Sequence, residues 1–142
     1  MLHWHLTVRL YGIKKGAQSW KLGVWDSSPC STNGYLCDMA VVAVKTGNSE
    51  KGAQNISLLI MDAKAPGFTK GKPLKKVGMH GQDTCELFFD NVKVPKNQLL
   101  GQAGHGFAYL MQELPRERTA IAATALGAIR GSIDVTTQYV QE

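Results

Sequence analysis

The sequence predicts an α+β fold, in which an antiparallel β-barrel or sandwich is followed by a long C-terminal helix. Two observations predict it. Between residues 36 and 94, short apolar or β-branched runs alternate with turn residues and show no helical repeat. After Gly106, apolar residues recur at helical spacing among many alanines. We therefore expect one β-domain and the beginning of a helical one.

Size and composition indicate a soluble globular chain. Its 142 residues suffice for one domain and an extra element, and 44% hydrophobic with 19% charged residues argues against disorder. The net charge of +5 is moderate, and no run approaches the 18 apolar residues of a membrane span. Cys30, Cys37 and Cys85 form no close-set metal pair, so we expect free thiols in a reducing compartment and no metal site.

Residues 1–25 leave two interpretations open. Four basic residues and no acid precede Asp26, which is typical of a mitochondrial transit segment. The apolar residues alternate with period two, however, and this favours a strand. They are Leu2, Trp4, Leu6, Val8 and Leu10. We find no convincing transit peptide and favour the strand.

Four strands are expected in order along the β-domain. Apolar and β-branched runs predict strands at 37–45, 56–62, 84–89 and 92–94. Polar residues at 48–52 and the triplet Ala65-Pro66-Gly67 predict turns between them.

Two helices are expected after the strands. Pro115 lacks an N–H donor, which predicts a short helix ending near Leu114 and a long one from about Pro115 to Gln141. Alanine-rich helices pack closely against other helices, yet the chain offers none of these. The pattern therefore predicts a partner surface outside this sequence.

Three motifs in fixed order carry a family resemblance. Residues 79–95 read M-H-G-Q-D-T-C-E-L-F-F-D-N-V-K-V-P, then come Asn97, Leu100-Gly101, Gly104 and Gly106-Phe107, and residues 113–118 read E-L-P-R-E-R. This series resembles the acyl-CoA dehydrogenases, which have a helical domain, a middle β-domain and a second helical domain. The resemblance implies that residues 1–104 are the middle domain, with 1–31 divergent. Residues 105–142 would be the truncated start of the C-terminal helical domain.

The resemblance implies that Glu117 is the catalytic base. Long-chain and isovaleryl members carry the pattern E-L-x-x-E-R with their catalytic glutamate at this position. The implied substrate-binding residues are Leu114, Pro115, Arg116, Arg118 and Ile121. Apolar neighbours would disfavour the charged carboxylate and raise its basicity. The alternative is an ordinary acid near a helix N-terminus.

A further motif, earlier in the chain, implies a flavin contact. Thr32-Asn33-Gly34 matches the end of the family pattern [WF]-I-[TS]-N-G, so the implied FAD-binding residues are Cys30, Ser31 and Thr32. Cys30 stands where the family has an aromatic ring, and Ser31 where it has isoleucine. The alternative is that Asn33-Gly34 is only a hairpin turn.

The expected function is FAD-dependent α,β-dehydrogenation of acyl-CoA thioesters. The expected partners are an acyl-CoA substrate, electron-transfer flavoprotein and further copies of the complete enzyme, in the mitochondrial matrix of a eukaryote or the cytoplasm of a bacterium. Because residues 1–25 do not match the family's T-E-P-x-A-G-S-D segment, we expect a partial, inactive chain. The alternative is a non-catalytic β-domain that associates with a full-length acyl-CoA dehydrogenase subunit. Five lysines between 64 and 76 are expected to form a solvated face rather than a nucleic-acid site.

Overall fold

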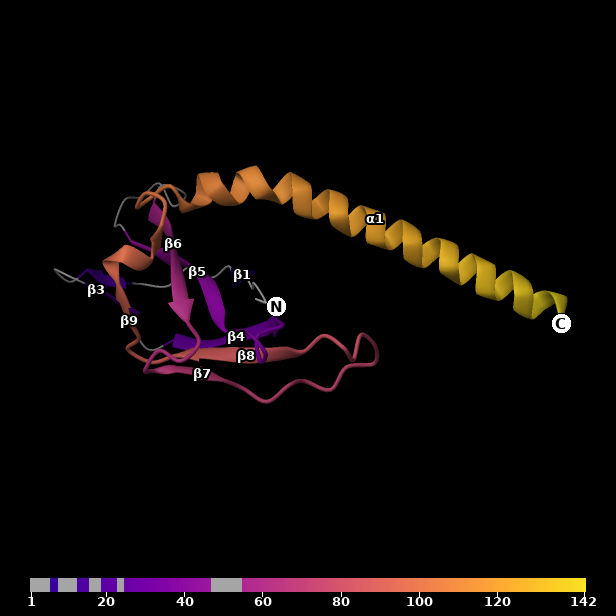
Figure 1. The fold of residues 1–142 in the computed structure, drawn as a ribbon, viewed down its shortest axis with the longest axis horizontal. Coiled ribbons are helices and arrows are strands. Elements are labelled where there is room, and N and C mark those ends of the chain that lie inside the picture. The colour runs from indigo at the N-terminus through magenta and orange to yellow at the C-terminus, as the bar shows by residue number, and fades with distance from the viewer. Residues whose placement is uncertain (1–5, 8–12, 16–18, 23–24, 47–54) are drawn as a thin grey trace. The chain divides into compact units, whose positions relative to one another are not determined.

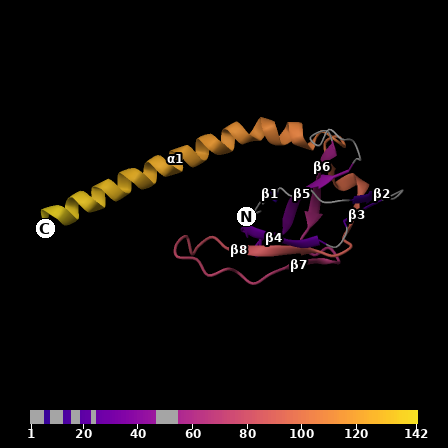
Figure 2. The same cartoon turned by 180° about the vertical axis from the view of Figure 1, so that it is seen from behind.

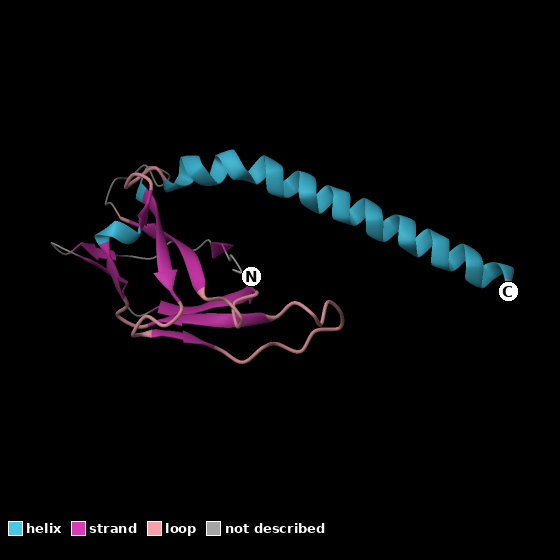
Figure 3. Cartoon of the chain, in the orientation of Figure 1, coloured by secondary structure: helices cyan, strands magenta, loops and turns pink. Residues whose placement is uncertain are grey.

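The computed structural model describes residues 6–7, 13–15, 19–22, 25–46 and 55–142, with side chains described from Ser31 onward. The chain divides into two units, Met1–Phe107 and Ala108–Glu142. The first unit holds the strands, and the second holds nearly all of one helix (Figures 1 and 3). The elements are β1 (Leu6–Thr7), β2 (Ile13–Lys15), β3 (Ser19–Leu22), β4 (Trp25–Thr32), β5 (Met39–Lys45), β6 (Ile56–Asp62), β7 (Phe68–Lys70), β8 (Thr84–Phe89), β9 (Lys93–Pro95), η2 (Lys96–Gln98), β10 (Leu99–Leu100) and α1 (Gly106–Gln141).

The strands form three small sheets, in the orders β1-β5-β6-β10, β4-β8-β7 and β2-β3-β9. Strands β5 and β6 pair antiparallel along their whole length, from Met39 opposite Asp62 to Lys45 opposite Ile56. Among the described pairs, β1 with β5 is parallel and the others are antiparallel. The predicted antiparallel β-domain is therefore confirmed.

The core lies between two of these sheets. Along β8 the inward positions Cys85, Leu87 and Phe89 alternate with half-buried ones, as expected for a strand with one buried face. Figures 1 and 2 show β5 and β6 in one layer and β4, β8 and β7 in another. The layers share one apolar cluster, as in a sandwich. It comprises Ala40, Val42, Val44, Leu59, Met61, Phe68, Cys85, Leu87, Phe89, Val92 and Val94.

The turn before β7 requires glycine. Gly67 has a φ of 87°, and a Cβ atom there would lie 2.0 Å from the carbonyl oxygen of Asp90. The Asp90 N–H donates to the Gly67 carbonyl oxygen at 2.7 Å, so the two backbones are in direct contact. This contact holds the start of β7 against the end of β8.

Helix α1 runs unbroken for 36 residues with Pro115 inside it. The predicted division into two helices at Leu114 and Pro115 is therefore wrong. A proline removes one N–H donor and crowds the preceding turn, but good helix formers on both sides continue the ladder. The Thr119 hydroxyl donates to the Pro115 carbonyl oxygen at 2.8 Å.

The N-terminal stretch is described in part. Leu6–Thr7 forms β1, which agrees with the strand interpretation at those two positions, and the remainder of 1–10 lies outside the described residues. Within the described part of the chain, no helix has the length and apolar character needed to cross a membrane.

Candidate active site

The candidate residues fall in two places, one in each unit. Ser31 and Thr32 end strand β4 in the β-domain. Glu117 and its neighbours lie in the first third of α1. The two groups of residues therefore belong to separate elements, the end of β4 and α1.

Strand β4 presents Thr32 and buries Ser31. In the pairing with β8, Ser31 lies opposite Cys85 and Thr32 opposite Thr84. Ser31 is 1% exposed, whereas Thr32 is half-buried, because successive residues of a strand point to opposite faces. Of these two residues, Thr32 is therefore the one whose side chain can meet a ligand. The side chain of Cys30 lies outside the described part of the chain.

The segment after Thr32 is a tight turn between sheets. The Gly34 N–H donates to the Ser31 carbonyl oxygen at 3.2 Å, and Asn33 has a φ of 56°. A Cβ atom at Gly34 would lie 3.0 Å from both the Ser31 carbonyl oxygen and the Cys85 sulfur. Strands β4 and β5 belong to different sheets, so the hairpin interpretation is wrong. The turn carries the chain from one layer of the sandwich to the other.

Asp83 and Lys70 hold this turn from two sides. The Asp83 carboxylate accepts hydrogen bonds from the Tyr35 N–H at 2.8 Å and the Leu36 N–H at 3.2 Å. The Asp83 carbonyl oxygen accepts the Asn33 N–H at 2.8 Å. The Lys70 ammonium donates to the Tyr35 and Cys37 carbonyl oxygens at 2.9 and 2.5 Å. Sequence reasoning missed both residues in this role, because they lie 33 to 48 positions from the turn.

Two thiols lie beneath the turn. Cys37 and Cys85 are free and buried, which confirms the expected free thiols at these two positions. The Cys37 thiol donates to the Gly34 carbonyl oxygen at 3.0 Å. Burial raises the pKa of both thiols, because the thiolate form loses its hydration. Both are therefore neutral near pH 7 and act as small apolar groups.

Helix geometry groups some of the candidate residues around Glu117. Leu114 and Ile121 are three and four residues from Glu117 and lie on its side of the helix, whereas Pro115, Arg116 and Arg118 point about 100° or more away from it. Glu117 is exposed, Leu114 is half-buried and Ile121 is 68% exposed. Arg116 lies 4.0 Å from the carboxylate of Glu113 in an exposed pair.

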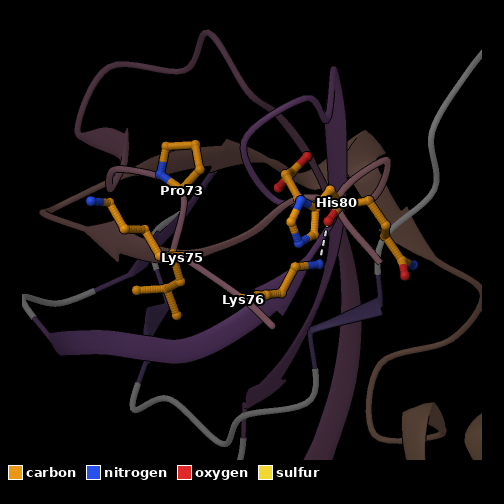
Figure 4. Close-up of a pocket in the computed structure, with 7 residues that line it drawn as sticks. Pro73, Lys75, Lys76 and His80 are labelled. Atoms are coloured by element: carbon orange, nitrogen blue, oxygen red, sulfur yellow. Dashed lines mark hydrogen bonds between the residues drawn. The ribbon is translucent and has the colours of Figure 1, made fainter. Parts of the chain in front are cut away.

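An open cavity of about 400 Å³ is lined in part by Asp83, which contacts the turn (Figure 4). Its lining is partly basic, with Lys75, Lys76 and His80, and it includes Asp83. Of the five lysines expected to form a solvated face, Lys64, Lys72 and Lys75 are exposed. Lys70 and Lys76 are half-buried and donate to main-chain carbonyl oxygens. Among the residues that the structure describes, no three His, Cys, Asp or Glu side chains form a metal-binding cluster.

Known proteins share this arrangement. The protein-family model of the acyl-CoA dehydrogenase middle domain matches residues 29–92. The family model of the acyl-CoA dehydrogenase C-terminal domain matches residues 104–142. The mouse mitochondrial long-chain specific acyl-CoA dehydrogenase is 43% identical over 130 residues, which cover 91% of this chain and 30% of that protein.

Solved structures agree. An acyl-CoA dehydrogenase from Geobacillus kaustophilus is 39% identical with a TM-score of 0.68, over 83% of this chain and 29% of its own. Butyryl-CoA dehydrogenase from Megasphaera elsdenii is 34% identical with a TM-score of 0.70, over 87% of this chain and 30% of its own.

The β-sandwich and the following helix thus correspond to a middle domain and to part of a C-terminal domain of one enzyme family. The chain belongs to the acyl-CoA dehydrogenase family. It spans about 30% of the length of the curated relatives that it matches first.

Proposed function

We propose that this chain takes part in the FAD-dependent α,β-dehydrogenation of fatty or branched acyl-CoA thioesters. The observation that supports this most directly is Glu117 within the motif E-L-P-R-E-R, inside the region matched by the C-terminal domain model. Glu117 is exposed on α1 and has Leu114 and Ile121 on the same side of the helix. These aliphatic side chains can contact an acyl chain while the carboxylate reaches its α-carbon.

Glu117 acts in this proposal as the general base. Its carboxylate takes the α-proton of the thioester, and the electron pair of the broken C–H bond moves toward the thioester carbonyl. Leu114 and Ile121 are the favoured substrate neighbours, because they share its side of the helix. Arg118 directly follows Glu117 and points about 100° around the helix from it, so it is a weaker candidate. Pro115 and Arg116 are weaker candidates, since their side chains turn away from that side.

The end of β4 fits one edge of a flavin ring in this proposal. Thr32 offers a half-buried side chain next to Asn33, whose N–H donates to the Asp83 carbonyl oxygen, whereas Ser31 is buried. Cys30 cannot supply the ring stacking that an aromatic residue offers. FAD, when bound, supplies the hydride acceptor.

Partners and location follow the same proposal. Electron-transfer flavoprotein would take the electrons, and a eukaryotic chain would lie in the mitochondrial matrix. The names of the mouse and pig relatives describe those proteins as mitochondrial. A bacterial chain would lie in the cytoplasm. Co-elution with electron-transfer flavoprotein, and imaging of a tagged chain, test the two statements.

A second candidate function is supported by the surface of α1. Leu126, Ile129, Ile133 and Val140 are each more than half exposed and recur at spacings of three, four and seven residues. Such an aliphatic stripe suits a non-catalytic role, in which the chain associates with a full-length acyl-CoA dehydrogenase subunit.

Exchange of the α-proton tests the role of Glu117 without requiring complete turnover. The chain is incubated with FAD and an acyl-CoA in D₂O, and deuterium entry at the α-carbon is followed by mass spectrometry. The partial chain is not expected to complete the dehydrogenation, but the wild type is expected to exchange the α-proton, and Glu117→Gln to exchange it at least about 100-fold more slowly, which is the lower range for loss of a general base.

Asp134→Asn is the matched control. It makes the same carboxylate-to-amide change at an exposed position of α1 that is 17 residues, or about 25 Å along the helix, from Glu117, and it should exchange like the wild type. Equal exchange by wild type and Glu117→Gln would overturn the base assignment. No exchange by the wild type would overturn the proposed activity for this chain.

A further inference from the structure

Several main-chain N–H and carbonyl groups of the turn after Thr32 are hydrogen-bonded to Asp83 or Lys70. The N–H groups of Asn33, Tyr35 and Leu36 all donate to Asp83. The carbonyl oxygens of Tyr35 and Cys37 both accept from Lys70. The Asp83 carboxylate thus accepts from Tyr35 and Leu36, the Asp83 carbonyl oxygen accepts from Asn33, and the Lys70 ammonium donates to two carbonyl oxygens. Hydrogen bonds to charged groups are shorter and stronger than neutral ones.

The two charged residues come from the same end of one sheet. Lys70 ends β7 and Asp83 directly precedes β8, while Thr32 ends β4. These three strands are neighbours in the order β4-β8-β7. Main-chain bonds from Gly71 to Glu86 and from Leu74 to Thr84 extend the contact between the same two segments beyond β7. Asp83 and Lys70 are therefore both anchored at hydrogen-bonded strands of the β4-β8-β7 sheet.

The turn needs these contacts with Asp83 and Lys70 because its sequence is compatible with several backbone conformations. Asn33 occupies the left-handed region with a φ of 56°, which costs energy for a residue with a side chain. Gly34 adds further backbone freedom. Without outside contacts, residues 33–36 could leave this geometry and carry the Thr32 side chain with them.

We propose that Asp83 and Lys70 are positioning residues that hold Thr32 in the geometry that meets the flavin. This inference rests on the proposed function and adds two residues that the family resemblance did not assign to the flavin site. Neither residue touches the cofactor in this proposal. Asp83 fixes the N–H groups of the turn, Lys70 fixes its carbonyl groups, and Thr32 at the adjoining strand end benefits from both.

The test combines a measurement without flavin and one with it. Amide hydrogen exchange of the whole chain reports on the turn, and titration with FAD, followed by flavin fluorescence, reports on binding. Asp83→Ala should speed exchange at Tyr35 and Leu36 by about tenfold or more, because both amides lose a charged acceptor. It should also weaken FAD binding by about tenfold. Asp83→Asn keeps one acceptor oxygen and should fall between.

Two further variants separate positioning from general stability. Lys70→Met keeps the length of the side chain, removes the donor to Tyr35 and Cys37, and should also weaken FAD binding. Asp90→Ala is the matched control, since Asp90 follows the opposite end of β8 and its side chain accepts a hydrogen bond from Asn91. It should leave both readouts of the turn unchanged.

The outcomes are distinguishable. Tight FAD binding by both the wild type and Asp83→Ala would overturn the positioning role and leave the proposed function intact. Unchanged exchange at Tyr35 and Leu36 in Asp83→Ala would overturn it as well. If the wild type failed to bind FAD, the proposed function would fall and this inference with it.

Discussion

The buried thiols Cys37 and Cys85 couple the stability of the β-domain to alkaline pH. Burial raises the pKa of each above the ordinary value of 9.0. As the pH rises through that value, the unfolded chain loses thiol protons that the folded chain still holds. The folded state then binds more protons, so the free energy of unfolding must fall with rising pH.

We therefore expect the β-domain to lose stability from about pH 9 upward. The loss is at most about 1.4 kcal/mol per pH unit for each thiol. Urea unfolding at pH 7, 9 and 10 measures it. The double variant Cys37→Ala, Cys85→Ala should be less stable at pH 7 but fall less steeply above pH 9. An equal slope in the two proteins would refute the thiol explanation.

At the scale of single residues, the sequence predicted which residues belong to family motifs better than it predicted which contacts they make. The motif around Glu117 could be recognised because a family resemblance carries it, whereas composition alone would leave an ordinary helix acid. Asp83 belonged to a recognised motif, yet its contacts with Tyr35 and Leu36 span 47 to 48 positions. Side-chain bonds at such separations follow from strand pairing, which local pattern does not encode.

Among the elements, strands with a clear apolar period were predictable. The expected strands at 56–62 and 84–89 coincide with β6 and β8. Strand β4 was missed because W-D-S-S-P-C-S-T has neither period two nor β-branched residues before its end. It forms by pairing with β8, with two register shifts along the way. Tertiary pairing here overrides weak local preference.

Pro115 is the element-scale feature with the clearest energetic consequence. Within α1 it supplies no N–H to the carbonyl of Met111, one turn earlier. Pro115→Ala should therefore stabilise the helix by up to about 3 kcal/mol. Circular dichroism at 222 nm during a thermal melt measures the gain.

Gly127→Ala calibrates that measurement. Apart from its chain neighbours and the adjoining helix backbone, no described atom lies within 4 Å of a Cβ placed at Gly127, so the change should add only about 1 kcal/mol of helix propensity. A gain from Pro115→Ala no larger than that from Gly127→Ala would show that the helix accommodates the proline at little cost.

For the whole molecule, the sequence predicted a partner surface, because the apolar residues of the C-terminal helix have no place in the core of the β-domain. The chain divides into a β-domain and a helical unit. The β-domain buries its apolar residues in one cluster, whereas the helical unit exposes most of its own. A lone helix of this kind gains little stability from propensity, and most helices in proteins depend on packing of an apolar side. This contrast supports the predicted partner surface.

Association through α1 is the whole-molecule prediction. The stripe of Leu126, Ile129, Ile133 and Val140 should bind a second copy of the chain when no longer relative is present, because burial of aliphatic area favours association. Light scattering after size exclusion should give a mass above that of one chain that rises with concentration. The double variant Ile129→Glu, Ile133→Glu should stay monomeric. Gln138→Glu, on the opposite side of α1, should associate like the wild type. A wild type that stays monomeric at all concentrations would refute the stripe as a self-association surface.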